Sequence, residues 1–224
     1  MENAAKKSHK GLVVLIAIVA VIAVIVVAVM ISNASSPYND GTFVYTPLEN
    51  KTYSVGLKDK SVTEIEIPVK DKDYKKPVTV VEGFTSETLK EVTIPEGITT
   101  IQSNAFSDCT KLEKIALPES LEKIGSYAFS NCTSLKQITL PGGLKELEGG
   151  VFEGCTELEK IEIPETVSKL YGNCFTGCTS LISITYHGTI AQLEEMNIEA
   201  FWPEDLQIRT IICSDGAYKI PDAE

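Results

Sequence analysis

The sequence predicts a β-rich solenoid of short parallel strands joined by short helical or 3-10 turns, preceded by one N-terminal transmembrane helix. Three observations predict it: an uninterrupted apolar run, a 23-residue internal repeat, and the overall composition. Of the 224 residues, 43% are hydrophobic and 23% are charged, which is too apolar for a disordered chain. The net charge of −11 argues against a basic nucleic-acid-binding surface, so no nucleic-acid partner is expected.

The apolar run predicts a transmembrane helix over residues 11–31. Residues 12–31 are all Leu, Ile, Val, Ala or Met, and a helix of that length spans about 30 Å, the thickness of a bilayer's hydrocarbon core. Lys6, Lys7 and Lys10 precede the run, and no Lys or Arg follows it before Lys51. Lys and Arg residues beside a transmembrane helix stay on the cytoplasmic side of the membrane. Residues 1–10 are therefore expected to form a cytoplasmic tail of a single-pass protein in the cell membrane, with the remaining chain extracellular.

A cleaved secretory signal peptide is the alternative, because Ser32 and Ala34 suit a cut before Ser35. The apolar run is longer than the usual hydrophobic region of about 7–15 residues, which favours an uncleaved anchor. Without the first ten residues the chain has 17 basic and 30 acidic residues, a net charge of −13. This charge disfavours general adhesion to an anionic bilayer. Residues 32–50 begin with small and polar residues and are predicted to be a stalk.

The main signal is a period of 23 residues over residues 89–188, in five units that start at residues 89, 112, 135, 158 and 181. Proline, phenylalanine and cysteine each recur once per unit, in register with aliphatic positions. The ladders are Pro95, Pro118, Pro141, Pro164; Phe106, Phe129, Phe152, Phe175; and Cys109, Cys132, Cys155, Cys178. Interleaved ladders of one period indicate a solenoid, in which each unit buries its apolar side chains against its neighbours.

One unit illustrates the expected local structure. Leu112, Ile115 and Leu117 have the spacing of a short strand with one face inward, and Pro118 ends that strand. After the strand, Leu121 and Ile124 are again expected to place apolar side chains in the core. Gly125 is expected to permit a tight bend, and Ala128-Phe129 to begin a short helical or 3-10 turn that places the phenylalanine inside.

The run AFSDCTKLEKIALPESLEKIGSYAFSNCTSLKQITLP resembles the BspA-like leucine-rich repeat family, whose units follow A-F-x-x-C-x-x-L-x-x-I-x-I-P-x-x-(V/L)-x-x-I-G. The resemblance is specific over residues 89–188. It extends weakly back through residues 51–88, which are similar to irregular first units of such arrays. It implies a parallel-stranded solenoid, often on secreted or surface-anchored proteins, that serves in adhesion or protein binding. It does not imply an enzyme.

The last unit departs from the repeat, and residues 189–224 are predicted to form a C-terminal cap. Thr189-Ile-Ala-Gln192 is a capping-box sequence that predicts a short helix from Thr189 to about Met196. Residues 207–213 are predicted to form a final strand, turned by Ser214-Asp215-Gly216. A cap of this kind shields the last core layer of a solenoid.

The cysteines and histidines do not predict a catalytic or metal-binding site. The four repeat cysteines and Cys174 are expected to be buried free thiols, although an oxidising exterior permits disulfides. Adjacent rungs place their Cβ atoms about 4.8 Å apart, slightly beyond the roughly 3.5–4.5 Å that a disulfide needs. His187 is expected to be a turn residue at the cap. No catalytic set, metal site or cofactor is predicted.

The outward side of the strands is the candidate partner-binding surface. Its first two ladders alternate in charge and are Lys90, Glu113, Lys136, Glu159, Ile182, and Glu91, Lys114, Gln137, Lys160, Ser183. Charge pairs between adjacent strands would make this surface self-neutralising, which is favoured over a mixed-charge docking face. The aromatic residues Tyr171, Tyr186, Phe201 and Trp202 are the alternative contact cluster, unless they seal the cap.

We therefore expect a membrane-anchored, cell-surface repeat protein that mediates adhesion or binds an extracellular protein. A membrane-tethered spacer without a specific ligand is the alternative, and an enzyme is a remote third option. Asn33, Asn50 and Asn131 lie in glycosylation sequons, which have meaning only in a source that glycosylates secreted proteins.

Overall fold

The computed structural model describes residues 37–220, except residues 74, 172, 197, 199–205 and 207. The chain divides into two units, Met1–Pro37 and Tyr38–Glu224. The predicted transmembrane helix lies outside the described residues. Within the described part, no helix combines the length and the apolar character needed to cross a bilayer.

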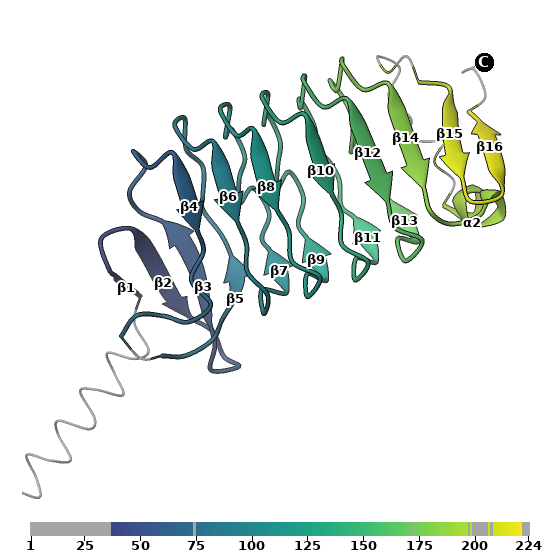
Figure 1. The fold of residues 1–224 in the computed structure, drawn as a ribbon. Coiled ribbons are helices and arrows are strands. Elements are labelled where there is room, and N and C mark those ends of the chain that lie inside the picture. Colours follow the sequence, from purple (N-terminus) through teal and green to yellow (C-terminus); the bar gives the residue numbers. More distant parts are fainter. Residues whose placement is uncertain are drawn as a thin grey trace, which may run out of the picture. The chain divides into compact units, whose positions relative to one another are not determined.

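Successive turns of the chain each contribute one short strand to a common row (Figure 1). These strands are β4 (Glu64–Glu66), β6 (Glu91–Thr93), β8 (Lys114–Ala116), β10 (Gln137–Thr139), β12 (Lys160–Ile163) and β14 (Ser183–Tyr186). Their pairing is parallel, and Ile138 lies opposite Ile161, which lies opposite Ile184. The 23-residue register predicted from the sequence is thereby confirmed. We call the outward side of this row the front face.

A second row of strands forms the other side of the solenoid. It contains β3 (Tyr53–Leu57), β5 (Val78–Val81), β7 (Thr100–Ile101) and β9 (Lys123–Ile124) in one sheet, and β11 (Glu146–Leu147) with β13 (Lys169–Leu170) in another. β9 coincides with the segment Leu121-x-x-Ile124, which was predicted only to place apolar side chains in the core, and β7, β11 and β13 hold the equivalent positions of their units. With the second row, a turn of the solenoid can pair with its neighbours through strands on two sides.

The core between the rows consists of the predicted ladders. Phe106, Phe129, Phe152 and Phe175 stack with ring centroids 5.4, 5.8 and 6.0 Å apart and nearly parallel planes. The repeated Ala-Phe corners are single turns rather than helices, closed by bonds such as Cys109 N to Phe106 O at 3.2 Å. Stacked rings fill the solenoid along its length, because no single unit can bury a phenylalanine alone.

The tight bend begins at the predicted glycine, where the Ala128 N–H donates to the Gly125 carbonyl oxygen at 3.2 Å, but the left-handed residue of the bend lies elsewhere. Gly125 lacks a positive φ; it is required because a Cβ there would lie 2.5 Å from the backbone nitrogen of Ser103. The left-handed conformation falls two residues later, at Tyr127 with φ 58° and at the equivalent Gly150 with φ 67°. The ring of Tyr127 lies where a Cβ of Gly150 would be, so these two positions pack as a pair.

The predicted stalk over residues 32–50 is wrong for its second half. Residues 38–47 form β1 (Tyr38–Asn39) and β2 (Phe43–Pro47), and β2 pairs antiparallel with both β1 and β3. The reason is that Phe43 and Tyr45 alternate inward and are buried. This hairpin begins the folded unit and covers the first core layer.

The C-terminal cap follows the prediction and adds one strand. Helix α2 (Ile190–Glu195) starts at the N-cap Thr189 with the complete capping box and ends at Met196. β15 (Thr210–Cys213) pairs with β14, and the turn at Ser214 and Asp215 leads into β16 (Gly216–Lys219), which was not predicted.

Candidate binding surface

Six of the predicted contact residues lie together on the front face. Lys90, Glu113, Lys136 and Glu159 each immediately precede a front strand, and Lys114 and Lys160 are the first residues of β8 and β12. All six side chains are exposed. The repeat places them in register because every unit begins its strand at the same position.

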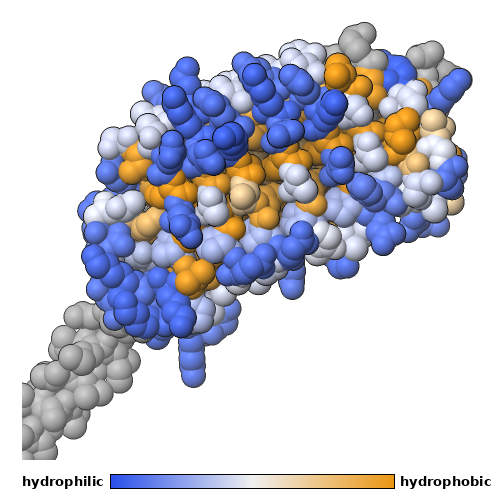
Figure 2. Space-filling model, in the orientation of Figure 1, coloured by the Kyte–Doolittle hydropathy of each residue, from blue (hydrophilic) through white to orange (hydrophobic). Residues whose placement is uncertain are grey.

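Five of the six line an open hollow of about 680 Å³ over β10, namely Glu113, Lys114, Lys136, Glu159 and Lys160. A second hollow of about 330 Å³ adjoins it and shares Glu113, Lys114 and Gln137. The apolar lining of the second hollow is Val92, Ile115, Ala116 and Ile138. We call the two hollows together the front groove. Figure 2 shows an apolar stripe along this face with hydrophilic side chains projecting on both sides of it.

The front groove coincides with a break in the strand ladder. β4, β6 and β8 form one sheet and β10, β12 and β14 belong to another, so β8 and β10 are not joined by ladder hydrogen bonds. Ile115 on β8 is partly exposed, whereas the equivalent Val92 and Ile161 are 1% and 2% exposed. Ile115 therefore exposes apolar surface beside the charged residues, whereas Ile138 on β10 is 5% exposed.

The expected neutralisation of this face by charge pairs occurs only in part. Lys114 pairs with Glu91 at 3.7 Å, as predicted for the second ladder. In the first ladder the prediction is wrong: Lys136 reaches diagonally to Glu157 at 3.9 Å instead of to its ladder neighbours. Among the described residues, Glu113, Glu159 and Lys160 form no ion pair. Both pairs are exposed, and such pairs contribute about 0–1 kcal/mol.

Only two members of the predicted aromatic contact cluster, Tyr171 and Tyr186, lie within the described residues. Tyr186 is 1% exposed, and its hydroxyl donates to the carbonyl oxygen of Val167 at 3.1 Å, so it seals the end of the core. Tyr171 is 46% exposed and lies just after β13 in the second row. Phe201 and Trp202 lie outside the described residues. The interpretation that these rings close the cap therefore holds for Tyr186, which is removed from the candidate contacts.

His187 lies in the bend after β14, as expected of a turn residue at the cap. Its Nε2 is 3.1 Å from a carboxylate oxygen of Glu162, and both side chains are exposed. No group of three or more His, Cys, Asp or Glu is placed to hold a metal ion in the part of the chain that the structure describes.

All six cysteines are free and buried, as predicted for five of them. Each repeat thiol donates to the carbonyl oxygen of a phenylalanine in the preceding turn, with Sγ–O distances of 3.3 Å from Cys109 to Phe84 and 3.1 Å from Cys155 to Phe129. Burial raises the pKa of Cys109 to about 11 and that of Cys174 to about 12. These thiols are core donors without nucleophilic character.

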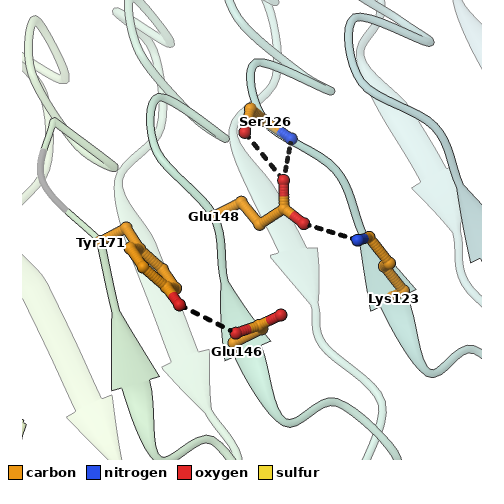
Figure 3. A network of polar contacts seen from close by, with 5 residues as sticks. All are labelled: Lys123, Ser126, Glu146, Glu148 and Tyr171. Atoms are coloured by element: carbon orange, nitrogen blue, oxygen red, sulfur yellow. Dashed lines mark hydrogen bonds and ion pairs between the residues drawn. The ribbon is translucent and has the colours of Figure 1, made fainter.

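The second strand row has a polar network that the sequence analysis missed (Figure 3). Glu148 accepts from Lys123 at 2.9 Å and from both the backbone and the hydroxyl of Ser126, while the hydroxyl of Tyr171 donates to Glu146 at 3.2 Å. Partial burial works to raise the pKa of Glu148, but the Lys123 and Ser126 contacts outweigh it and the pKa is lowered. The side-chain bond to Glu148 raises the pKa of Lys123. Both side-chain contacts, Lys123 to Glu148 and Tyr171 to Glu146, join residues 25 apart, so the 23-residue ladder did not predict them.

The fold and the front groove define the class: a parallel-stranded repeat solenoid with a mixed-charge groove on one strand row. A profile of the BspA type leucine rich repeat region, in six copies, matches residues 81–206. The chain therefore belongs to the BspA-type leucine-rich repeat family.

Solved structures of bacterial leucine-rich repeat proteins have the same fold. The T. pallidum leucine-rich repeat protein TpLRR is 26% identical with a TM-score of 0.61, over 66% of this chain and 70% of that one. A leucine-rich repeat protein from Bacteroides ovatus is 24% identical with a TM-score of 0.51, over 68% of this chain and 42% of that one. No curated protein matches this sequence.

Proposed function

We propose that this chain is a single-pass, membrane-anchored, cell-surface protein whose front groove binds an extracellular protein partner in adhesion or assembly. The front groove is the observation that supports the partner: it combines the partly exposed apolar side chain of Ile115 with three charged groups that form no ion pair within the described chain. A surface of this kind suits a polypeptide segment with apolar side chains flanked by charges. The lysine-flanked apolar run at residues 12–31 supports the anchor.

The spacer alternative has support in the Glu91–Lys114 and Lys136–Glu157 pairs, which neutralise part of the face. A spacer needs the front face only for stability, whereas a binder needs its exposed chemistry. Substitutions that leave stability unchanged therefore distinguish the two functions.

The test is the double substitution Lys136→Gln and Glu159→Gln in the full chain on cells. The matched control is Lys111→Gln with Glu122→Gln, which removes the same charges from exposed positions outside the groove. A photo-reactive residue at Gln137 identifies the bound protein by crosslinking. We expect the groove variant to weaken binding roughly tenfold or more while the control binds normally. Equal binding by both variants, or no crosslinked protein, would contradict the groove as a partner site.

Orientation is tested separately. Protease added to intact cells should digest the repeat unit while residues 1–10 stay protected. Protection of the repeats would contradict the anchor topology.

A further inference from the structure

An exposed valine and three exposed lysines lie in the segment that connects β4 to β5. Val69 is 52% exposed, and Lys70, Lys72 and Lys75 are exposed beside it. The segment is a small hairpin, with a bridge between Lys70 and Pro77 and a bond from Val78 N to Val69 O at 3.1 Å. We call Val69, Lys70, Lys72 and Lys75 the basic loop.

The negative charge of Asp71 is removed from the surface of this hairpin. Asp71 is 0% exposed; its carboxylate accepts from the Tyr38 hydroxyl at 2.5 Å and from the Lys76 backbone N–H at 2.5 Å. Lys76 extends over the ring of Tyr53, with Nζ 5.8 Å from the centroid. The exposed side of the hairpin therefore presents the ammonium groups of the basic loop against one carboxylate, Asp73.

The basic loop lies at the end of the sheet where the chain enters the folded unit. β1 starts at Tyr38 and runs antiparallel to β2, and β3 runs antiparallel to β2 from Tyr53. Tyr53 pairs with Val78, so the connection before β5 lies at the same end as the start of β3. The bond from Tyr38 to Asp71 ties the hairpin directly to the entering chain.

Chain length keeps this end near the bilayer, if residues 12–31 span it as in the proposed function, on which this inference rests. Residues 32–37 separate the apolar run from Tyr38. At roughly 3.3–3.6 Å per residue, Tyr38 stays within about 25 Å of the membrane boundary.

Charge is distributed unevenly along the exterior chain. Residues 37–76 hold seven lysines against seven acidic residues, whereas residues 77–224 hold ten basic against 23 acidic residues. An anionic surface therefore repels the repeats and cap but not the entry end. Exposed lysines attract anionic headgroups within a Debye length, and an adjacent apolar side chain can enter the interface.

We propose that the basic loop docks onto anionic phospholipid headgroups of the bilayer that holds the chain's own anchor, with Val69 at the lipid interface. Docking fixes the entry end at the membrane and directs the acidic repeats, with their front groove, away from it. The net acidity of the exterior domain is compatible with this contact because the acidic residues lie farther along the chain.

The test uses the full chain with Val69→Cys, labelled with an environment-sensitive fluorophore and reconstituted in vesicles. The native cysteines are all buried, so the label is selective for the new thiol. One vesicle is phosphatidylcholine; the other is equal parts of phosphatidylcholine and phosphatidylglycerol. We expect the emission of a fluorophore in an apolar environment only on the anionic vesicle. At high ionic strength the emission should return to that of a fluorophore in water. Ile182→Cys, at an equally apolar and 70% exposed position, is the control and should keep aqueous emission.

Charge variants complete the design. Replacing Lys70, Lys72 and Lys75 with Gln should reduce the docked-to-free ratio roughly 100-fold, because each lysine contributes about a factor of five near an anionic surface. Removing Lys111, Lys145 and Lys169 instead should leave the emission unchanged. If the chain floats with both vesicles but the label at position 69 keeps the emission of an aqueous environment, the loop contact alone is overturned. Failure to float on either vesicle would overturn the anchor and the loop contact together.

Discussion

The repeat cysteines show how one side chain meets two requirements of a solenoid corner. Each is small and fully buried, and each thiol donates to a phenylalanine carbonyl oxygen of the preceding turn. The carbonyl oxygens of Phe106, Phe129 and Phe152 also accept a backbone N–H, so alanine would remove only the thiol's hydrogen bond, whereas serine would bring a more polar group into an apolar site. The position therefore selects cysteine by size and by weak hydrogen bonding.

Thiol reactivity gives the residue-scale prediction. Because burial raises the pKa of Cys109 from an ordinary 9.0 to about 11, the folded protein keeps its proton where an unfolded chain loses it. We expect a thiol reagent at neutral pH to modify none of the six cysteines in the folded protein and all six in denaturant. Stability should fall as the pH rises from about 9 to about 11, because only the unfolded state ionises readily in that window. Rapid modification of native Cys109 would contradict this assignment.

At the scale of elements, the front strands that the repeat defines were predicted from the sequence. The strands that depend on pairing with a neighbour were not. The front strands follow from Leu112, Ile115 and Leu117, whose spacing fixes which side is buried. The second row was missed because a two-residue strand such as Lys123–Ile124 has too few residues for a period-two pattern and becomes a strand only through its neighbours. The N-terminal hairpin was missed because the polar residues around Pro37 are typical of a stalk. The alternation of Phe43 and Tyr45 is the pattern that indicates a strand.

The hairpin before β5 depends on Asp71, which gives the element-scale prediction. Asp71→Ala removes the acceptor for the Lys76 N–H and for the Tyr38 hydroxyl, and hydrogen bonds to a charged group contribute about 1.5–3 kcal/mol each. We expect faster amide hydrogen exchange in β1, β2 and β3 with little change in β12 and β14, since solenoid units contact mainly their neighbours.

Tyr38→Phe should have a smaller effect in the same strands. In the double variant the two effects should not add, because both changes remove the same hydrogen bond. Uniformly faster exchange along the whole solenoid, or full additivity, would show that Asp71 acts elsewhere.

For the whole molecule, the candidate site was predictable in position but not in shape. The repeat alone placed Glu113, Lys136 and Glu159 on one face. The front groove lies at the missing ladder between β8 and β10 and is lined by the uncharged Ser134 and Gln137 as well as by charged residues. A repeat pattern makes every rung equivalent, so it does not reveal which rung interrupts the sheet.

Deleting one repeat tests both the fold and the groove. Removing residues 135–157 joins Ser134 to Leu158 and keeps every ladder in register, so Phe129 should stack on Phe175 and β8 should adjoin β12. We expect a folded β-rich protein by circular dichroism whose urea m-value falls by about an eighth, in proportion to the lost surface, and which no longer binds the groove partner. Removing residues 135–146 instead shifts the ladders out of register and should abolish cooperative unfolding, because apolar positions would then face solvent. Equal tolerance of both deletions would contradict a core built from register, whereas retained binding by the in-register deletion would move the partner site away from β10.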